Sequence, residues 1–226
     1  IINSINTLKA KIRDLWFFLI DPIIICGWPV ELPDGVLNTA YDLIRENWGI
    51  CISDEVQVGC GRLGESFWGF ELHDVIPDII TIGKPLGNGH PIGAVVCTSE
   101  IAESFANGME FFNTFGGNPV SCSIATQVLK VVKNENLQKN AKTIGNYFKN
   151  ELKNLSDKYD IIGDVRGQGL FLGIEFVDHN MNPLLQETKY IVNLLKDFGI
   201  LARLDGHNKN FINIKPPINF HYNQCA

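Results

Sequence analysis

The sequence predicts an α/β fold with a large, mostly parallel β-sheet, followed by a smaller α+β domain. Short β-rich apolar runs at 17–20, 50–52 and 79–82 are separated by long connections, one with apolar residues at helical spacing. Strands that alternate with helices in this way are typical of parallel sheets. From residue 160 the pattern changes to closely spaced strands around one helix. We therefore expect a large domain over residues 1–134 and a small domain, incomplete at its end, over 135–226.

The elements of the large domain are predicted from apolar spacing and from turn residues. Residues 1–14 have the pattern of the tail of a helix, and Asp21-Pro22 closes the strand at 17–20. A helix is predicted from residue 36 to residue 48, where Gly49 ends it. A strand at 92–98 precedes a helix through residue 105, with Ser99 as its N-cap.

The elements after residue 110 follow the same rules. Asn118 is the expected cap of a helix that starts at Pro119, since proline suits the first helical position. An apolar stripe over 137–155 predicts a helix of about five turns. Strands are expected at 161–162, 171–177, 200–204 and 211–214, and a helix at 186–198 ends at Gly199.

Composition excludes several classes of partner. The chain of 226 residues has 19 Lys and Arg against 25 Asp and Glu, a net charge of −6, with no basic stripe. Nucleic acids and membranes are therefore not expected as partners. The six cysteines form no CxxC pair, which favours free thiols in a reducing compartment over disulfides or a metal site.

Two predicted strands are each followed by an ionisable residue that is a candidate for binding a cofactor. Asp54 follows the run at 50–52 and Lys84 follows the run at 79–82, so in a parallel sheet both face one crevice. A desolvated lysine can form a Schiff base, and a carboxylate beside it can keep a pyridine nitrogen protonated, which is what pyridoxal phosphate needs. Gln57 is placed to contact the ring oxygen. The alternative is a lysine and a carboxylate that are merely solvated at strand ends.

Three motifs resemble the class-III aminotransferase family, which has the fold of the fold-type-I pyridoxal-phosphate-dependent transferases. They are residues 54–64, 77–91 and 113–119, in register within a likeness that runs from about residue 18 to 217. The resemblance implies that Lys84 binds the cofactor covalently, that Asp54 pairs with the pyridinium and that Gln57 contacts the ring oxygen. It also implies that Thr114 reaches the cofactor phosphate of a neighbouring subunit, in a homodimer that shares its active sites.

Within this family the sequence is most similar to the branch called alanine–glyoxylate aminotransferase 2-like. Residues 83–91, 108–122, 205–210 and 214–217 carry this likeness. It implies a phospho-lyase that acts on a small amine, ethanolamine phosphate or phosphohydroxylysine. The alternative is an alanine–glyoxylate type transaminase, which shares the first half of the reaction. The likeness also suggests a mitochondrial or cytoplasmic protein.

Some positions depart from the family pattern. Asn213 stands where many family members have an arginine that binds the substrate carboxylate. Asparagine cannot form that charged pair, so we expect either a substrate without this carboxylate or one whose carboxylate is bound by Lys215. The alternative is that Asn213 and Lys215 only alternate on an exposed strand. The sequence has no counterpart of the glycine- and serine-containing segment that binds the cofactor phosphate in the N-terminal part of the family. Residues 21–27 also differ from the Glu-Pro-x-Gln-Gly run that is usual in the family. We therefore expect a truncated chain that is itself inactive, and an inactive remnant is a further alternative.

Overall fold

The computed structural model describes residues 17–24 and 30–225, so the helix predicted at 1–14 lies outside the described residues. The chain forms two compact units, each described by itself. Of the described residues, the first contains 17–22, 32–59 and 68–130, and the second contains 23–24, 30–31, 60–67 and 131–225. Within the described ranges, no helix combines the length and the apolar character needed to cross a membrane.

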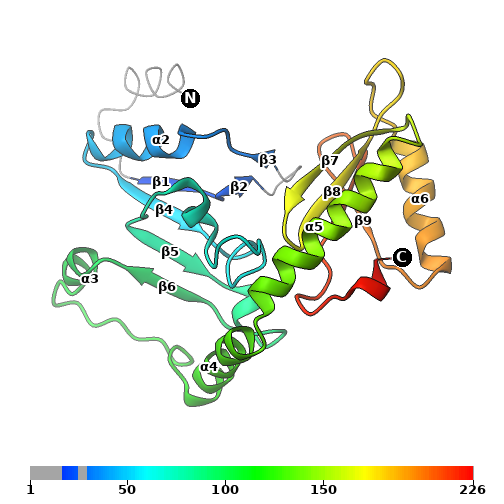
Figure 1. The fold of residues 1–226 in the computed structure, drawn as a ribbon. Helices are drawn as coiled ribbons and strands as arrows, with labels where there is room; N and C mark the ends of the chain where they lie inside the picture. Colours follow the sequence, from blue (N-terminus) through cyan, green and yellow to red (C-terminus); the bar gives the residue numbers. More distant parts are fainter. Residues whose placement is uncertain (1–16, 25–29, 226) are drawn as a thin grey trace. The chain divides into compact units, whose positions relative to one another are not determined.

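The first unit is built on a mostly parallel four-stranded sheet, as predicted (Figure 1). Its strands are β1 (Phe17–Ile20), β4 (Ile50–Asp54), β5 (Ile79–Ile82) and β6 (Ala94–Cys97), in the order β1-β4-β5-β6. The first three are parallel, and β6 runs antiparallel to β5. The carboxyl ends of β1, β4 and β5 therefore meet at one edge of the sheet.

Helix α2 (Val36–Arg45) covers one face of this sheet (Figure 1). Its buried side chains Leu37, Tyr41 and Ile44 pack with Cys51 of β4, and the side chain of Phe18 closes the same cluster. Gly35 precedes the helix with a φ of 76°, a conformation that glycine adopts at no steric cost. The helix thus fixes β1 against β4 by shared apolar burial.

Shorter elements connect the strands of this unit. The turns η1 (Gly69–His73) and η2 (Lys84–Leu86) lie on either side of β5, and α3 (Ser99–Phe105) follows β6. Thr98, and not Ser99, occupies the N-cap of α3, which corrects the predicted cap by one position. Helix α4 (Pro119–Asn134) starts as predicted, because the Asn118 side chain accepts the Ser121 N–H at 2.9 Å.

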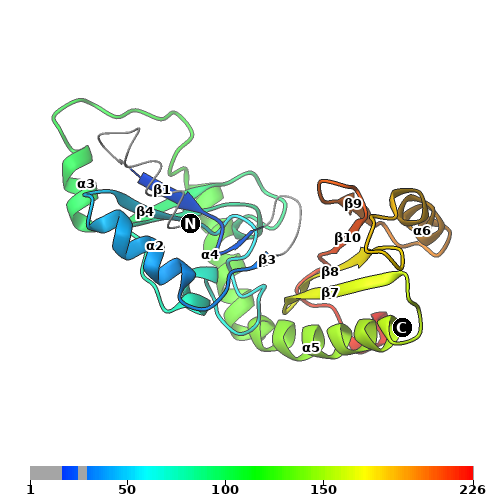
Figure 2. The same ribbon diagram turned by 90° about the horizontal axis from the view of Figure 1, so that it is seen from above.

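The second unit is an antiparallel sheet with two helices. Strands β7 (Ile162–Gln168), β8 (Phe171–Phe176), β10 (Phe211–Ile214) and β9 (Arg203–Asp205) are ordered β7-β8-β10-β9. Helix α5 (Leu137–Ser156) lies along β7, as Figure 2 shows, and α6 (Leu185–Asp197) packs on β8 and β10. A two-stranded ribbon, β2 (Ile23–Ile24) and β3 (Val30–Glu31), and the turn η3 (Tyr222–Gln224) complete the unit.

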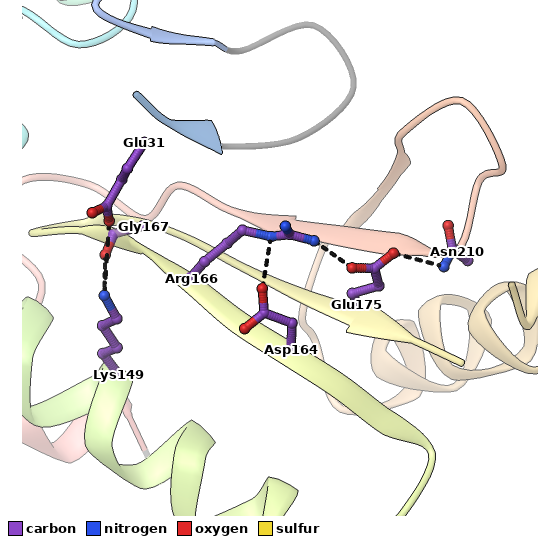
Figure 3. Close-up of polar contacts among 7 residues, drawn as sticks. All are labelled: Glu31, Lys149, Asp164, Arg166, Gly167, Glu175 and Asn210. Atoms are coloured by element: carbon purple, nitrogen blue, oxygen red, sulfur yellow. Dashed lines mark hydrogen bonds and ion pairs between the residues drawn. The ribbon is translucent and has the colours of Figure 1, made fainter. Parts of the chain in front are cut away.

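The helices pack on the face of this sheet that carries Val165, Leu172 and Ile212. The other face carries charged side chains, with Arg166 over the ring of Phe211. The guanidinium of Arg166 forms an ion pair with the Glu175 carboxylate on the adjacent strand, and its Nε lies 3.3 Å from a carboxylate oxygen of Asp164 (Figure 3). Glu175 is buried and also accepts the Asn210 amide at 3.4 Å. A second contact joins α5 to β7, since the Lys149 amine donates to the Gly167 carbonyl at 2.7 Å (Figure 3). These charges are satisfied within the unit, which indicates a structural role.

Candidate active site

Asp54 is the last residue of β4 and lies half-buried at the carboxyl edge of the first sheet. Its position is fixed by register, because Asp54 pairs with Thr81 of β5 and the Glu55 N–H donates to the Thr81 carbonyl at 2.9 Å. One carboxylate oxygen accepts the Val56 N–H at 3.0 Å, which turns the chain after the strand. The strand pairing and this hydrogen bond therefore fix the position of the Asp54 carboxylate.

Lys84 follows β5 by two residues and starts the turn η2. The turn is closed by hydrogen bonds from the Leu86 N–H to the Gly83 carbonyl at 2.8 Å and from the Gly87 N–H to the Lys84 carbonyl at 3.3 Å. Gly87 has no room for a side chain, since a Cβ there would collide with the carbonyl of His90. This tight backbone leaves the Lys84 side chain exposed to solvent.

A third ionisable residue, Asp21, lies at the same edge. It directly follows β1, whose last residue Ile20 pairs with Ser53, the residue before Asp54. Burial raises the pKa of Asp21 from 3.8 to about 6; the charge of Asp54 adds to this shift and the charge of Lys84 opposes it. Asp21 is thus within electrostatic range of both predicted residues. The sequence indicated it only as the strand exit, because nothing in its spacing shows that β1 lies next to β4.

Gln57 lies in the loop after β4, half-buried. The loop is anchored by Glu55, which is fully buried and accepts the N–H groups of Gly69 and Phe70 at 2.7 and 3.0 Å and the Ser53 hydroxyl at 3.0 Å. Burial raises the pKa of Glu55, and these donors oppose the shift. The anchor fixes the start of the Gln57 loop relative to η1.

Thr114 lies on a different loop, 106–118, and is exposed. The Asn113 side chain accepts the N–H groups of Phe115 and Gly116 at 3.1 and 2.8 Å, which folds the backbone around Thr114. The loop ends at α4, where the Ser121 hydroxyl contacts the His90 ring at 2.8 Å. His90 belongs to the segment that follows Lys84, so this contact ties the Lys84 segment to the start of α4.

The two weaker candidates, Asn213 and Lys215, lie in the second unit. Asn213 donates its amide to the Asp205 carboxylate at 3.1 Å. Burial raises the pKa of Asp205, but the hydrogen bonds from Asn213 and Gly206 and the charges of Arg203 and Lys215 together bring it below its ordinary value. The Lys215 amine lies 4.5 Å from the centre of the Phe171 ring. Asn213 therefore already has a carboxylate partner within its own sheet.

Comparison with known proteins places this chain in a family. Residues 6–226 match the family described as aminotransferase class-III. The chain is 45% identical over 215 residues to the alanine–glyoxylate aminotransferase 2-like protein of Drosophila melanogaster, covering 93% of this chain and 44% of that protein. It is 47% identical over 203 residues to human mitochondrial alanine–glyoxylate aminotransferase 2, covering 88% and 39%. The chain thus spans less than half the length of these relatives.

Solved structures agree with this assignment. A phospholyase from Arthrobacter in complex with phosphoethanolamine superposes with a TM-score of 0.94 at 37% identity, covering 99% of this chain and 53% of that one. Acetylornithine aminotransferase from Elizabethkingia anophelis gives 0.84 at 30% identity, covering 97% and 56%. Enzymes of this family depend on pyridoxal phosphate. From the match across residues 6–226 and from these relatives, the chain belongs to the class-III aminotransferase family, with the α/β fold predicted from its sequence.

Proposed function

We propose that the protein is a pyridoxal-phosphate enzyme in which Lys84 holds the cofactor and acts as the base, and that it eliminates phosphate from a small phosphorylated amine. The observation that carries the cofactor proposal is the meeting of Asp54 and Lys84 with Asp21 at one sheet edge. The donor set fits the group, since it offers an amine for the aldehyde carbon and a backbone-held carboxylate for the ring nitrogen.

Each predicted residue has a defined task in this proposal. The carboxylate of Asp54 would keep the ring nitrogen protonated, and the amide of Gln57 would donate to the ring oxygen. Thr114 would bind the cofactor phosphate through its hydroxyl and the folded backbone around it. When bound, the cofactor supplies an electron sink for the substrate carbon that carries the amine.

The proposed reaction begins with Lys84. With its amine free, Lys84 would remove a proton from the substrate carbon next to nitrogen. The electron pair of that bond then expels phosphate from the neighbouring carbon. Water hydrolyses the resulting enamine to an aldehyde and ammonia. No keto acid is consumed.

The environment of Asn213 supports a substrate without an α-carboxylate. Its amide faces the Asp205 carboxylate, and a second carboxylate would be repelled by that charge. Phosphoethanolamine, the ligand of the Arthrobacter phospholyase, has no carboxylate. The second candidate is transamination between alanine and glyoxylate, because the human relative at 47% identity carries that name. In that case Lys215 would be the partner of the substrate carboxylate.

We also propose a homodimer. Loop 106–118 exposes a group of large apolar side chains, with Met109 83% and Phe112 78% exposed and Phe111 and Phe115 similarly exposed. Apolar patches of this kind mark protein interfaces. A second copy of the chain would bury them and bring Thr114 to the neighbouring active site. Localisation in the mitochondrion or the cytoplasm remains a proposal, supported by the mitochondrial human relative.

The substrate is tested by product release. The protein is incubated with ethanolamine phosphate and pyridoxal phosphate, and phosphate and acetaldehyde are measured with and without glyoxylate. The lyase proposal predicts release without a keto acid, at equal rates in both mixtures. Turnover that needs both alanine and glyoxylate would instead establish the transaminase. The same assays are run on a longer protein, in which the N-terminal part of a family member precedes this chain. The comparison shows whether these 226 residues suffice for activity. No turnover in either form would favour an inactive remnant.

A further inference from the structure

Glu55 is a fully buried carboxylate next to Asp54, and the proposed function assigns it no task. One of its oxygens accepts the Gly69 N–H at 2.7 Å, and the other accepts the Phe70 N–H and the Ser53 hydroxyl, both at 3.0 Å. A buried carboxylate needs such donors, because loss of contact with water is costly for an unpaired charge. The three donors therefore fix the Glu55 side chain, one residue away from the predicted partner of the cofactor ring.

The backbone of Glu55 is fixed as well. Its N–H donates to the Thr81 carbonyl of β5 at 2.9 Å, and its carbonyl accepts the Gly59 N–H at 3.1 Å. The backbone at the start of η1 is packed closely, since a Cβ on Gly69 would lie 2.8 Å from the Val58 side chain. Glu55 thus joins three parts of the first unit, which are β5, the loop after β4 and η1.

Side chains alternate along an extended strand, and this alternation links Glu55 to Asp54. Cys51 and Ser53 are buried on one side of β4, and the hydrogen bond from Ser53 shows that Glu55 continues on that side. Asp54 therefore points to the opposite side, where its carboxylate accepts the Val56 N–H at 3.0 Å. Rotation of the strand end would pull Glu55 away from its donors, so these contacts keep Asp54 in its orientation.

We propose that Glu55 is a positioning residue for Asp54: its buried carboxylate fixes the end of β4 against η1 and so sets the direction of the Asp54 carboxylate. The inference deepens the proposed function, because Asp54 is the residue that would pair with the ring nitrogen of the cofactor. A carboxylate that is already oriented loses less conformational freedom on binding, which favours affinity. Glu55 itself would touch neither cofactor nor substrate.

The first test needs no cofactor and follows amide hydrogen exchange in the 226-residue protein by NMR. The Val56 N–H reports on Asp54, because it donates to that carboxylate. Its rate is divided by that of the Cys51 N–H in the same strand, so that a general loss of stability does not raise the ratio. Glu55→Gln keeps the size of the side chain, but its NH2 group would face an N–H donor in either orientation of the amide.

Three further variants accompany Glu55→Gln. Ser53→Ala removes only one of the three donors to Glu55. Glu71→Gln makes the same chemical change within η1, where the Glu71 carboxylate accepts the Trp68 N–H at 2.9 Å. Ile44→Val removes one methylene from the buried cluster under α2 and so lowers the stability of the same unit by an apolar change alone.

We expect Glu55→Gln to raise the ratio of the Val56 rate to the Cys51 rate by about threefold to tenfold, and Ser53→Ala to raise it by about twofold. Neither Glu71→Gln nor Ile44→Val should raise it. An unchanged ratio in Glu55→Gln would overturn the inference, as would an equal rise in either control. If Glu55→Gln does not fold, the ratio in Ser53→Ala decides in the same way.

The second test connects this result with the cofactor. Wild type and Glu55→Gln, each also as the longer protein, are incubated with limiting pyridoxal phosphate and reduced with borohydride, and the label on Lys84 is compared with that on exposed Lys139. We expect Glu55→Gln to lower the Lys84 label by about threefold to tenfold. Specific Lys84 label of equal size in both proteins would overturn the role of Glu55. Label that does not distinguish Lys84 from Lys139 in wild type would refute the proposed function and leave the exchange result intact.

Discussion

The pKa of Asp21 predicts that this residue costs stability at neutral pH. Its pKa rises from 3.8 to about 6 on folding, so the folded protein holds the proton more tightly than the unfolded chain. The favourable contribution of this proton is fully present below about pH 4 and is lost as pH rises through about 6. Asp21→Asn has no charge to bury and should therefore be more stable than wild type at pH 7.

The magnitude follows from the size of the shift. A shift from 3.8 to about 6 corresponds to at most about 3 kcal/mol. Asp21 is only half-buried, so solvent screening reduces this to about 1 kcal/mol. We expect Asp21→Asn to increase the free energy of unfolding by about 1 kcal/mol at pH 7 and by close to zero at about pH 3.

Urea denaturation of both proteins at the two pH values measures this difference, and Asp34→Asn, which removes an exposed carboxylate in the same unit, is the matched control. Comparing variants at each pH cancels the titration of the other carboxyl groups. A variant that is less stable than wild type at pH 7, or a stability gain of the same size at both pH values, would refute the reasoning.

The remaining predictions concern the turn, the second sheet and the exposed loop. Gly87→Ala should lower the free energy of unfolding by about 1 to 3 kcal/mol, because the added Cβ would collide with the backbone carbonyl of His90. Gly93→Ala is the control and should be nearly neutral, because its Cβ would meet only the Ile82 carbonyl oxygen at 3.6 Å. Urea unfolding midpoints check both. Glu175→Gln removes the less exposed of the two carboxylates that pair with Arg166 and should cost about 2 kcal/mol. The more exposed Asp164→Asn should cost about 0 to 1 kcal/mol, and equal costs would contradict the assignment. Phe112→Ser should shift sedimentation from dimer to monomer without changing stability, and an unchanged sedimentation coefficient would argue against the loop as the interface.

Much of the fold could be predicted, because apolar runs and turn residues act locally. The strand at 17–20 and the strand at 211–214 have the observed bounds, and the helix at Pro119 starts with the predicted cap. The placement of Asp54 and Lys84 at one sheet edge also followed from local patterns, since both lie just after strands. Their chemical roles stay predictions.

The parts that were missed depend on contacts between distant segments. Asp21 became a site residue only because β1 pairs with β4, and strand order leaves no trace in hydrophobic periodicity. The bond from Asn213 to Asp205 likewise needs the register of β9 against β10. The sequence left two interpretations of Asn213, a substrate-binding residue or a residue on an exposed strand face. The structure shows in addition that its amide donates to the Asp205 carboxylate.

The central claim is that Lys84 binds pyridoxal phosphate, and covalent trapping tests it most directly. The protein, and the longer form with the preceding family sequence, are incubated with pyridoxal phosphate, reduced with borohydride and digested. We predict that the cofactor mass is found on the peptide containing Lys84, that it is absent in Lys84→Ala, and that it is unchanged in Lys139→Ala. Labelling that is equal on Lys84 and Lys139, or cofactor bound to neither form, would contradict the account.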